Sequence, residues 1–357
     1  MRNTYKVLVL GASYGSLLAT KLLLAGHTVK LACLAVEAEL INKEGTRVCL
    51  PVKGKDKLVE IDSRQLTGML SADVPESINP DDFDLVTLAM QEPQYCSAGV
   101  RELLDAVAKA KVPCMSIMNM PPLPYLARIP GLCPDAYRDS YTDPTVWDSF
   151  DPALMTLCSP DPQAFRPPDA MTNVLQVNLP TNFKVARFDS ELHTAVLRQL
   201  QSDIEAVRFD TGGDTIELPV KLKVHDSIFV PLAKWSMLLT GNYRCVQQDS
   251  TRSIKEAVHS DIDQSRSVYN WVGELCRTMG ASEKDQVSFE KYASAAQGLV
   301  TPSSAARALL AGAIAIERVD RLVQSIAAHK GMRSDTVDAI VALVEARLDA
   351  NRRAMSG

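Results

Sequence analysis

The sequence that decides the fold runs Lys6-Val7-Leu8-Val9-Leu10, then Gly11-Ala12-Ser13-Tyr14-Gly15-Ser16, and on to Ala32. Its first five residues form a continuous apolar run, which is typical of a strand buried on both faces of a parallel sheet. Leucines then recur at helical spacing from Leu17 to Leu24 until Gly26 ends the helix. A second buried strand follows over residues 28–32. The stretch therefore predicts a βαβ unit of roughly thirty residues.

The turn inside this unit is short and glycine-rich, and it leads into the start of a helix. Free backbone N–H groups and the helix dipole favour a phosphate at such a point. The turn is one residue shorter than the dinucleotide fingerprint G-x-G-x-x-G, and Ser13 stands at the middle glycine. The Ser13 hydroxyl can nevertheless donate to a pyrophosphate. We predict that Gly11, Ser13, Tyr14 and Gly15 bind a dinucleotide; the alternative is a Rossmann-type domain that no longer binds one.

The same pentapeptide permits two other interpretations. It matches G-x-S-x-G, the nucleophile elbow of α/β-hydrolases. An elbow lies deep in a sheet built by earlier strands, whereas this turn follows the first strand of the chain, so we reject that interpretation. The Gly-Ala-Ser opening also occurs in short-chain dehydrogenases, but these need a glycine where Leu17 stands and a Tyr-x-x-x-Lys pair that the sequence lacks.

Composition narrows the class of protein. A chain of 357 residues favours two domains, and a net charge of −5 argues against a nucleic-acid or anionic-membrane partner. No apolar run is long enough to span a membrane, and the first residues lead directly into a strand without a signal peptide. The eight cysteines are scattered without C-x-x-C spacing, which favours free thiols over disulfides or a metal site. We therefore expect a cytoplasmic protein.

The rest of the first domain delivers amide side chains to one edge of the sheet. A buried strand over residues 83–90 is followed by Gln91, and another over residues 112–118 is followed by Asn119. Ligands bind at the carboxyl ends of strands in open α/β sheets, so both are candidates for cofactor binding. The simpler explanation is that these amides cap the following turns. Cofactor preference is not readable, because Cys33 and its neighbours replace both the acid and the arginine that would contact the ribose.

The apolar period changes near Ser190. Before it, residues 48–71 and 121–190 contain short apolar pieces that read as extra strands. After it, helical spacing dominates over residues 190–207, 226–241, 253–279, 283–297, 303–328 and 334–353. We predict a Rossmann-type parallel-sheet domain over residues 1–189 and a helical substrate or dimerisation domain over residues 190–357. This order suggests a cleft between them for nicotinamide and substrate. The apolar stretch 337–348 fits either core packing or a homodimer contact.

Lys234 is the candidate for acid–base chemistry. It lies among apolar residues of the helix predicted over 226–241, and Asn242 follows two helical turns later. Desolvation lowers the pKa of a lysine, which makes its ammonium group a usable proton donor near neutral pH. The simpler explanation is that Lys234 extends to water and that Asn242 caps the helix after Gly241.

The chain resembles the ketopantoate reductase (2-dehydropantoate 2-reductase) family. The resemblance covers Gly15 to Val29, the strand at Phe83 leading to Gln94, the strand ending in Asn119, and the Lys234 to Asn242 spacing. Ser303-Ser304 and Glu317 also resemble the family's Ser-Ser and later Glu. The resemblance implies reduction of a small 2-oxo acid to a 2-hydroxy acid with NADPH, or with NADH. It implies that Lys234 is the general acid, Glu317 a further catalytic residue, and Asn242 and Ser304 substrate contacts.

The chain departs from the family at several positions. The glycine turn is shortened, Gln91 replaces a lysine, Met120 replaces a glycine, and Leu238 replaces an asparagine. The resemblance thus predicts an NAD(P)H-dependent oxidoreductase. These departures leave open whether its substrate is ketopantoate or another small oxo acid. Two alternatives stay open. An opine-dehydrogenase-like enzyme would present a catalytic His–Asp pair, and a non-catalytic module would bind a dinucleotide or a partner without turnover.

Overall fold

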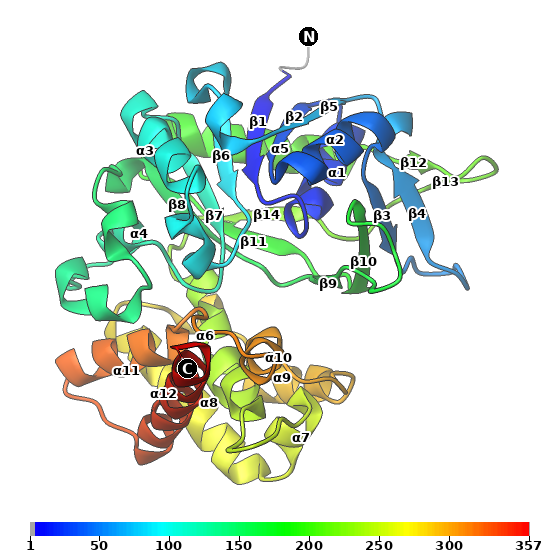
Figure 1. Ribbon diagram of the computed structural model, residues 1–357. Coiled ribbons are helices and arrows are strands. Elements are labelled where there is room, and N and C mark those ends of the chain that lie inside the picture. The colour runs from blue at the N-terminus through cyan, green and yellow to red at the C-terminus, as the bar shows by residue number, and fades with distance from the viewer. Residues whose placement is uncertain (1–3, 357) are drawn as a thin grey trace. The chain divides into compact units, whose positions relative to one another are not determined.

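The computed structural model describes residues 4–356 and divides into two compact units (Figure 1). We call them unit 1 and unit 2 and describe each by itself. Unit 1 comprises the chain up to Met90, Gln94–Arg128 and Thr145–Asp226. Unit 2 comprises Gln91–Pro93, Ile129–Pro144 and the chain from Ser227 onward. Among the described residues, no helix combines the length and the apolar character needed to cross a membrane.

An eight-stranded sheet organises unit 1, and it begins with the predicted βαβ unit of β1 (Lys6–Leu10), α1 (Gly15–Leu24) and β2 (Thr28–Ala32). The strand order is β14-β11-β8-β7-β6-β1-β2-β5. The pairs from β5 to β8 are parallel, β11 runs antiparallel to β8, and β14 is parallel to β11. The remaining bounds are β5 Met69–Asp73, β6 Leu85–Leu88, β7 Cys114–Ile117, β8 Met155–Ser159, β11 Phe183–Ala186 and β14 Leu222–His225.

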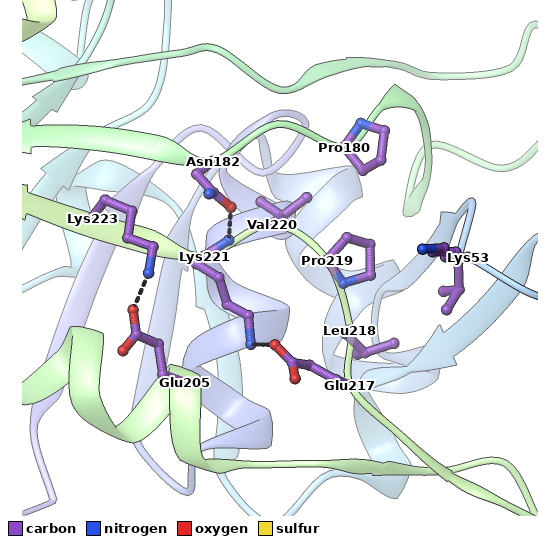
Figure 2. A pocket seen from close by; sticks show the side chains of 11 residues that line it. Lys53, Pro180, Asn182, Glu205, Glu217, Leu218, Pro219, Val220, Lys221 and Lys223 are labelled. Carbon is purple, nitrogen blue, oxygen red and sulfur yellow. Dashed lines mark hydrogen bonds and ion pairs between the residues drawn. The ribbon is translucent and has the colours of Figure 1, made fainter.

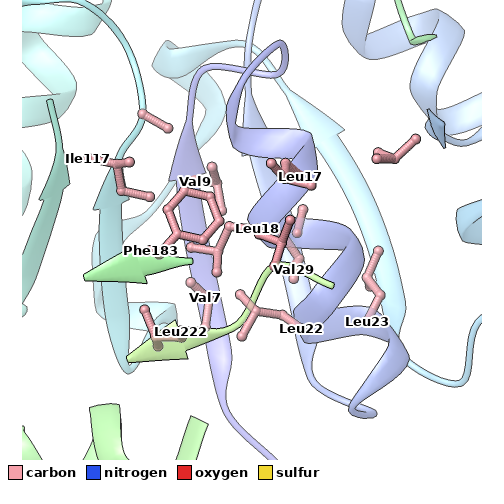
Figure 3. Packing of buried hydrophobic residues seen from close by; sticks show 14 of the residues in the cluster. Val7, Val9, Leu17, Leu18, Leu22, Leu23, Val29, Ile117, Phe183 and Leu222 are labelled. Atoms are coloured by element: carbon pink, nitrogen blue, oxygen red, sulfur yellow. The ribbon is translucent and has the colours of Figure 1, made fainter. Parts of the chain in front are cut away.

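The core of unit 1 forms where α1 packs on the centre of this sheet. Leu17, Leu18 and Leu22 of α1 and Val7 and Val9 of β1 are at most 1 % exposed. Figure 3 shows these side chains gathered with those of β11 and β14, which come from far along the chain. Burying an aliphatic side chain of this size contributes about 2 kcal/mol, so this contact holds α1 and the turn before it in place.

Smaller elements complete unit 1. A four-stranded sheet of order β4-β3-β10-β9 confirms the extra strands, whereas the β12-β13 hairpin lies in the half that we predicted to be helical. Their bounds are β3 Arg47–Leu50, β4 Val59–Asp62, β9 Gln163–Phe165, β10 Val174–Leu179, β12 Phe209–Asp210 and β13 Thr215–Ile216. The helices are α2 Ala35–Glu44, α3 Val100–Ala110, α4 Leu123–Leu126 and α5 Glu191–Ala206.

The boundary between the units does not lie between residues 189 and 190, as we predicted, because helix α5 belongs to unit 1. The helix itself forms as its spacing predicts, but its buried face, including Leu197 and Leu200, packs against α1 and β14. Strand β14 then adds to the edge of the large sheet next to β11. Unit 1 consequently extends to Asp226. The helical period signals a helix but carries no information about which layer the helix covers.

Unit 2 is almost entirely helical. Most of the long helical segments predicted from the sequence are each divided into shorter helices: Asp261, for example, caps α8 and breaks residues 253–279 into two. Helix α12 buries Val337, Val344 and Leu348 within unit 2, so its apolar positions belong to the core. The helices are α6 Lys234–Met237, α7 Ile254–His259, α8 Ile262–Thr278, α9 Phe289–Ala296, α10 Ser304–Leu310, α11 Val319–His329 and α12 Asp335–Ser356.

Candidate functional site

The glycine turn after β1 requires glycine at its first position. Gly11 has φ = +102°, a conformation that L side chains rarely adopt, and a Cβ there would lie 2.6 Å from Met90 Cγ and 2.9 Å from the Ala89 carbonyl oxygen. Its N–H donates to the Ala32 carbonyl at 3.0 Å, which joins the turn to the end of β2. The turn therefore lies in tight contact with the carboxyl end of β6.

Gly15 serves the close approach of α1 to β1, as its position predicts. A Cβ there would lie 2.5 Å from Val9 Cγ1. The Ser13 carbonyl accepts the N–H and hydroxyl of Ser16, but no described residue accepts the backbone N–H groups of Tyr14 and Gly15. These groups, at the positive end of α1, fit a pyrophosphate. The Tyr14 hydroxyl instead donates to the Pro162 carbonyl at 2.7 Å, so its side chain is a structural contact.

An ion pair that the sequence did not suggest lies at the end of β2. Arg166, which follows β9, is 2.6 Å from Glu37 in the first turn of α2. Both side chains are partly exposed, at 30 % and 16 %. In dinucleotide-binding domains, the residues at this place contact the adenine ribose, where an acid suits a 2′-hydroxyl and an arginine suits a 2′-phosphate. No local signal could have found Arg166, because it reaches this place from another sheet.

Asn119 stands at the predicted edge of the sheet. It follows β7, which pairs with β6, and β6 pairs with β1, so Asn119 and the glycine turn lie at the same edge. Gln91 was expected beside it. The structure places Gln91 on the surface and groups it with unit 2.

Lys234 is half-buried on a helical segment that changes its winding. The segment passes from a 3-10 turn, η8 (Val230–Ala233), into α6 and then into a π-helical turn, η9 (Leu238–Asn242). A π turn adds one residue, so eight residues span close to two full turns and bring Lys234 and Asn242 to within about 30° on the same face. Gly241 does not end the helix, as one explanation supposed. A Cβ there would lie 2.1 Å from the Tyr292 hydroxyl, which donates to the Met237 carbonyl.

The end of this segment holds the other candidates of unit 2. The Ser303 hydroxyl caps α10 and donates to the Asn242 carbonyl at 2.7 Å. The Tyr243 hydroxyl donates to the Glu317 carbonyl and accepts the Val319 N–H at 3.0 Å. Glu317 is 8 % exposed. The structure therefore brings Asn242 and Glu317 to the same helix end.

Ser304 belongs to this region but differs from its neighbour Ser303. It is the first residue of α10 and is exposed, whereas Ser303 is buried and committed to the cap.

Glu92 is a buried acid that the motif analysis passed over. It is 3 % exposed, and its carboxylate accepts the Thr142 N–H at 2.9 Å and the Thr142 hydroxyl at 2.8 Å. Burial, with a smaller contribution from the nearby Glu317, raises the pKa of Glu92 to about 7. Glu92 and Glu317, both in unit 2, thus lie close enough for the charge of one to affect the ionisation of the other. The signal was available, because Glu92 lies next to Gln91, just beyond the carboxyl end of a buried strand.

The described His–Asp ion pair lies away from this chemistry. His27 Nε2 is 3.5 Å from Asp203, and both side chains are buried. His27 directly precedes β2, at the amino ends of the parallel strands, opposite the glycine turn. Asp226, which directly follows His225 in the sequence, pairs instead with Arg198 at 2.6 Å. Neither arrangement supports the opine-dehydrogenase-like alternative.

Two grooves among the described residues, one in each unit, are lined by none of the predicted site residues. The groove of unit 1 has a volume of about 540 Å³ and contains Lys221 and Lys223 (Figure 2). Figure 2 shows that Lys221 and Lys223 are paired with Glu217 and Glu205 respectively, so the charges of these two lysines are balanced; Lys53 also lines the groove. Among the described residues, no cluster of three or more His, Cys, Asp or Glu side chains could hold a metal ion.

Comparisons with known proteins identify the fold. No protein-family model and no curated protein matches the chain. Solved structures do match. A 2-dehydropantoate 2-reductase from Methylococcus capsulatus is 11 % identical over 97 % of both chains, with a TM-score of 0.65. A D-mandelate dehydrogenase, solved with NADH and anilino(oxo)acetate, is 13 % identical over 97 % of this chain and 99 % of its own, with a TM-score of 0.63.

A dimeric ketopantoate reductase from Staphylococcus aureus is 12 % identical over 97 % of this chain and 99 % of its own, with a TM-score of 0.59. The chain has the fold of the ketopantoate reductases. The resemblance read from the sequence is therefore confirmed at the level of the fold, over both units.

Proposed function

We propose that this chain is an NAD(P)H-dependent oxidoreductase that reduces a small 2-oxo acid to a 2-hydroxy acid. The observation that supports it most is the π turn of unit 2, whose winding is consistent with Lys234 and Asn242 sharing one face; at its end Ser303 bonds to the Asn242 carbonyl and Tyr243 to the Glu317 carbonyl. π turns inside helices are frequent at functional sites. The D-mandelate dehydrogenase among the structural neighbours, solved with NADH and an oxo compound, supports the same class.

The residues of unit 1 fit a dinucleotide. The backbone N–H groups at the start of α1 would hold its pyrophosphate, with Gly11 allowing the close approach and the Ser13 hydroxyl as a further donor. Glu37 and Arg166 would contact the adenine ribose. When bound, the nicotinamide supplies a hydride. Asn119, at the same edge of the sheet, would orient the cofactor.

In this proposal, Lys234 donates a proton to the oxygen of the substrate carbonyl as that carbonyl is reduced. Lys234 is half-buried and its sequence neighbours are apolar; desolvation of a lysine favours proton donation near neutral pH. Asn242 and Ser304 would bind the substrate carboxylate, and Glu317 would orient substrate or lysine. A homodimer, as in the Staphylococcus aureus neighbour, stays a prediction for this chain.

The experiment follows NADPH and NADH oxidation optically across a panel of 2-oxo acids. Removing Lys234 should lower turnover by about two orders of magnitude or more. Lys234→Arg is the sharper variant, because arginine keeps the positive charge but does not give up its proton. We expect it to fail as Lys234→Ala does, while Lys255→Ala, an exposed lysine of the same unit, keeps full activity.

Two outcomes would contradict the proposal. Turnover that survives in Lys234→Ala would exclude this lysine as the proton donor. Saturable binding of either dinucleotide, followed by no oxidation with any oxo acid, would favour the non-catalytic dinucleotide-binding module.

A further inference from the structure

The groove of unit 2 contains two arginines that form no ion pair with a described carboxylate. It has a volume of about 400 Å³, and Arg244 and Arg252 line it together with Thr336, Ile340 and Leu343. It lies between the segment that follows the π turn and helices α8 and α12. None of the residues proposed above for catalysis lines it, so the inference is independent of the proposed function.

Arg244 is held in a fixed orientation by neutral partners. It is only 6 % exposed, and its guanidinium donates to the Thr240 carbonyl at 3.3 Å, the Ser265 hydroxyl at 2.6 Å and the Gln264 amide oxygen at 2.7 Å. No carboxylate of residues 4–356 lies within 4.0 Å of it. Burial, and then the nearby Arg252, lower the pKa of Arg244, while Asp261, which lies too far away for an ion pair, acts in the opposite direction. A buried charge of this kind is costly unless an opposite charge meets it.

Arg252 adds a second positive charge beside the first. Its Nε donates to the Arg244 carbonyl at 2.8 Å and its Nη1 to the Ser260 hydroxyl at 3.2 Å. It too lacks an ion pair with any described carboxylate. The acid that lines the groove is Asp335, whose side chain is 97 % exposed and lies 3.8 Å from Arg333. In the groove of unit 1, by contrast, Lys221 and Lys223 each form an ion pair with a glutamate.

The remaining wall is apolar. Val246, Ala339, Ile340 and Leu343 line it, the last three on one face of α12. Pockets of a few hundred Å³ with an apolar lining and a few fixed polar groups are typical of small-molecule sites. A planar guanidinium recognises a carboxylate through paired N–H donors, and an aliphatic group would cover the apolar wall. We propose that this groove binds a small carboxylate carrying a short branched apolar group, at a site distinct from the one proposed for reduction.

The test uses 4-methylpentanoate as the probe, titrated calorimetrically into the full-length protein. We expect saturable binding with a dissociation constant of about 1 mM, and at least about tenfold weaker binding of 4-methylpentanamide, which has the same shape without the charge. Ala339→Trp should fill the groove from an exposed position and abolish binding. Ala342→Trp, exposed on the same helix but outside the groove, should leave binding unchanged.

Two further variants distinguish binding at this groove from binding at the proposed reductase site. Binding should persist in Lys234→Ala, so that a defect in the proposed reductase site is distinguishable from a defect here. Arg244→Met should weaken binding at least about tenfold, with circular dichroism showing a folded protein; if it does not fold, Ala339→Trp decides.

The proposal is overturned by equal binding of acid and amide, by unchanged binding in Ala339→Trp, or by inorganic phosphate binding where 4-methylpentanoate does not. It is also overturned if sedimentation shows that Ala339→Trp dissociates a dimer, because the groove would then be covered by a second copy.

Discussion

At the scale of single residues, Arg166 offers a means of choosing between the two cofactors. Its guanidinium lies beside Glu37 at the end of β2. If it contacts a 2′-phosphate, Arg166→Ala should raise the KM for NADPH at least about tenfold and leave the KM for NADH nearly unchanged. Steady-state kinetics with both cofactors measure this. Arg208→Ala, which removes an exposed arginine of the same unit, is the control, and an equal effect on both cofactors would contradict the assignment.

Glu92 predicts a pH dependence of stability. Its pKa rises from 4.5 to about 7 on folding, so the folded state binds the proton more tightly than the unfolded chain. The stabilisation is complete below about pH 4.5 and is lost as the pH rises to about 7, and it amounts to about 3 kcal/mol at most. Glu92→Gln should remove this part of the dependence and be more stable than the wild type at pH 8.

Urea unfolding at intervals from pH 4 to pH 8 measures the effect. Glu39→Gln, an exposed glutamate on α2, should follow the wild-type profile. Parallel profiles for Glu92→Gln and the wild type would show that folding does not raise the pKa of Glu92.

At the scale of elements, replacing a glycine in the turn between β1 and α1 has two energetic costs, backbone strain and steric overlap. A comparison with Gly54 distinguishes them. Gly11 and Gly54 both have positive φ, at +102° and +83°. A Cβ at Gly54 meets nothing within 4 Å, whereas at Gly11 it overlaps Met90 and Ala89. Gly54→Ala should therefore cost about 1 kcal/mol for the backbone alone, and Gly11→Ala clearly more.

Gly11→Ala should also abolish dinucleotide binding, measured by quenching of intrinsic fluorescence, while Gly54→Ala retains it. Thermal unfolding compares their stabilities. Equal stabilities for the two variants would mean that the turn relaxes away from β6 without loss.

At the scale of the whole molecule, the placement of α5 predicts how fragments behave. Its Leu197, Leu200 and Ile204 are at most 1 % exposed because they face the sheet of unit 1. A fragment of residues 190–357 would expose this face, whereas residues 227–357 would not carry it. Fluorescence of a dye that binds apolar surface should be clearly stronger with the longer fragment. Equal dye binding by both fragments would mean that α5 finds cover within the helical unit.

The sequence by itself determined the features that neighbouring residues encode. The apolar run of β1, the leucine spacing of α1 and the glycines of the turn each specify a local conformation through side-chain periodicity or allowed backbone angles. Together they predicted the βαβ unit and its place at the start of a parallel sheet. The change to helical spacing also predicted the second, helical half.

Only the tertiary structure revealed the features that depend on contacts between residues distant in the sequence. Arg166 meets Glu37, Glu92 meets Thr142, and α5 covers β14 only because the folded sheet brings these segments together. The winding of the segment after Lys234 likewise depends on Tyr292, which reaches the Met237 carbonyl across the helical unit. Local periodicity reports which side of an element is apolar, but burial, charge balance and the partner of each polar group are properties of the packed chain.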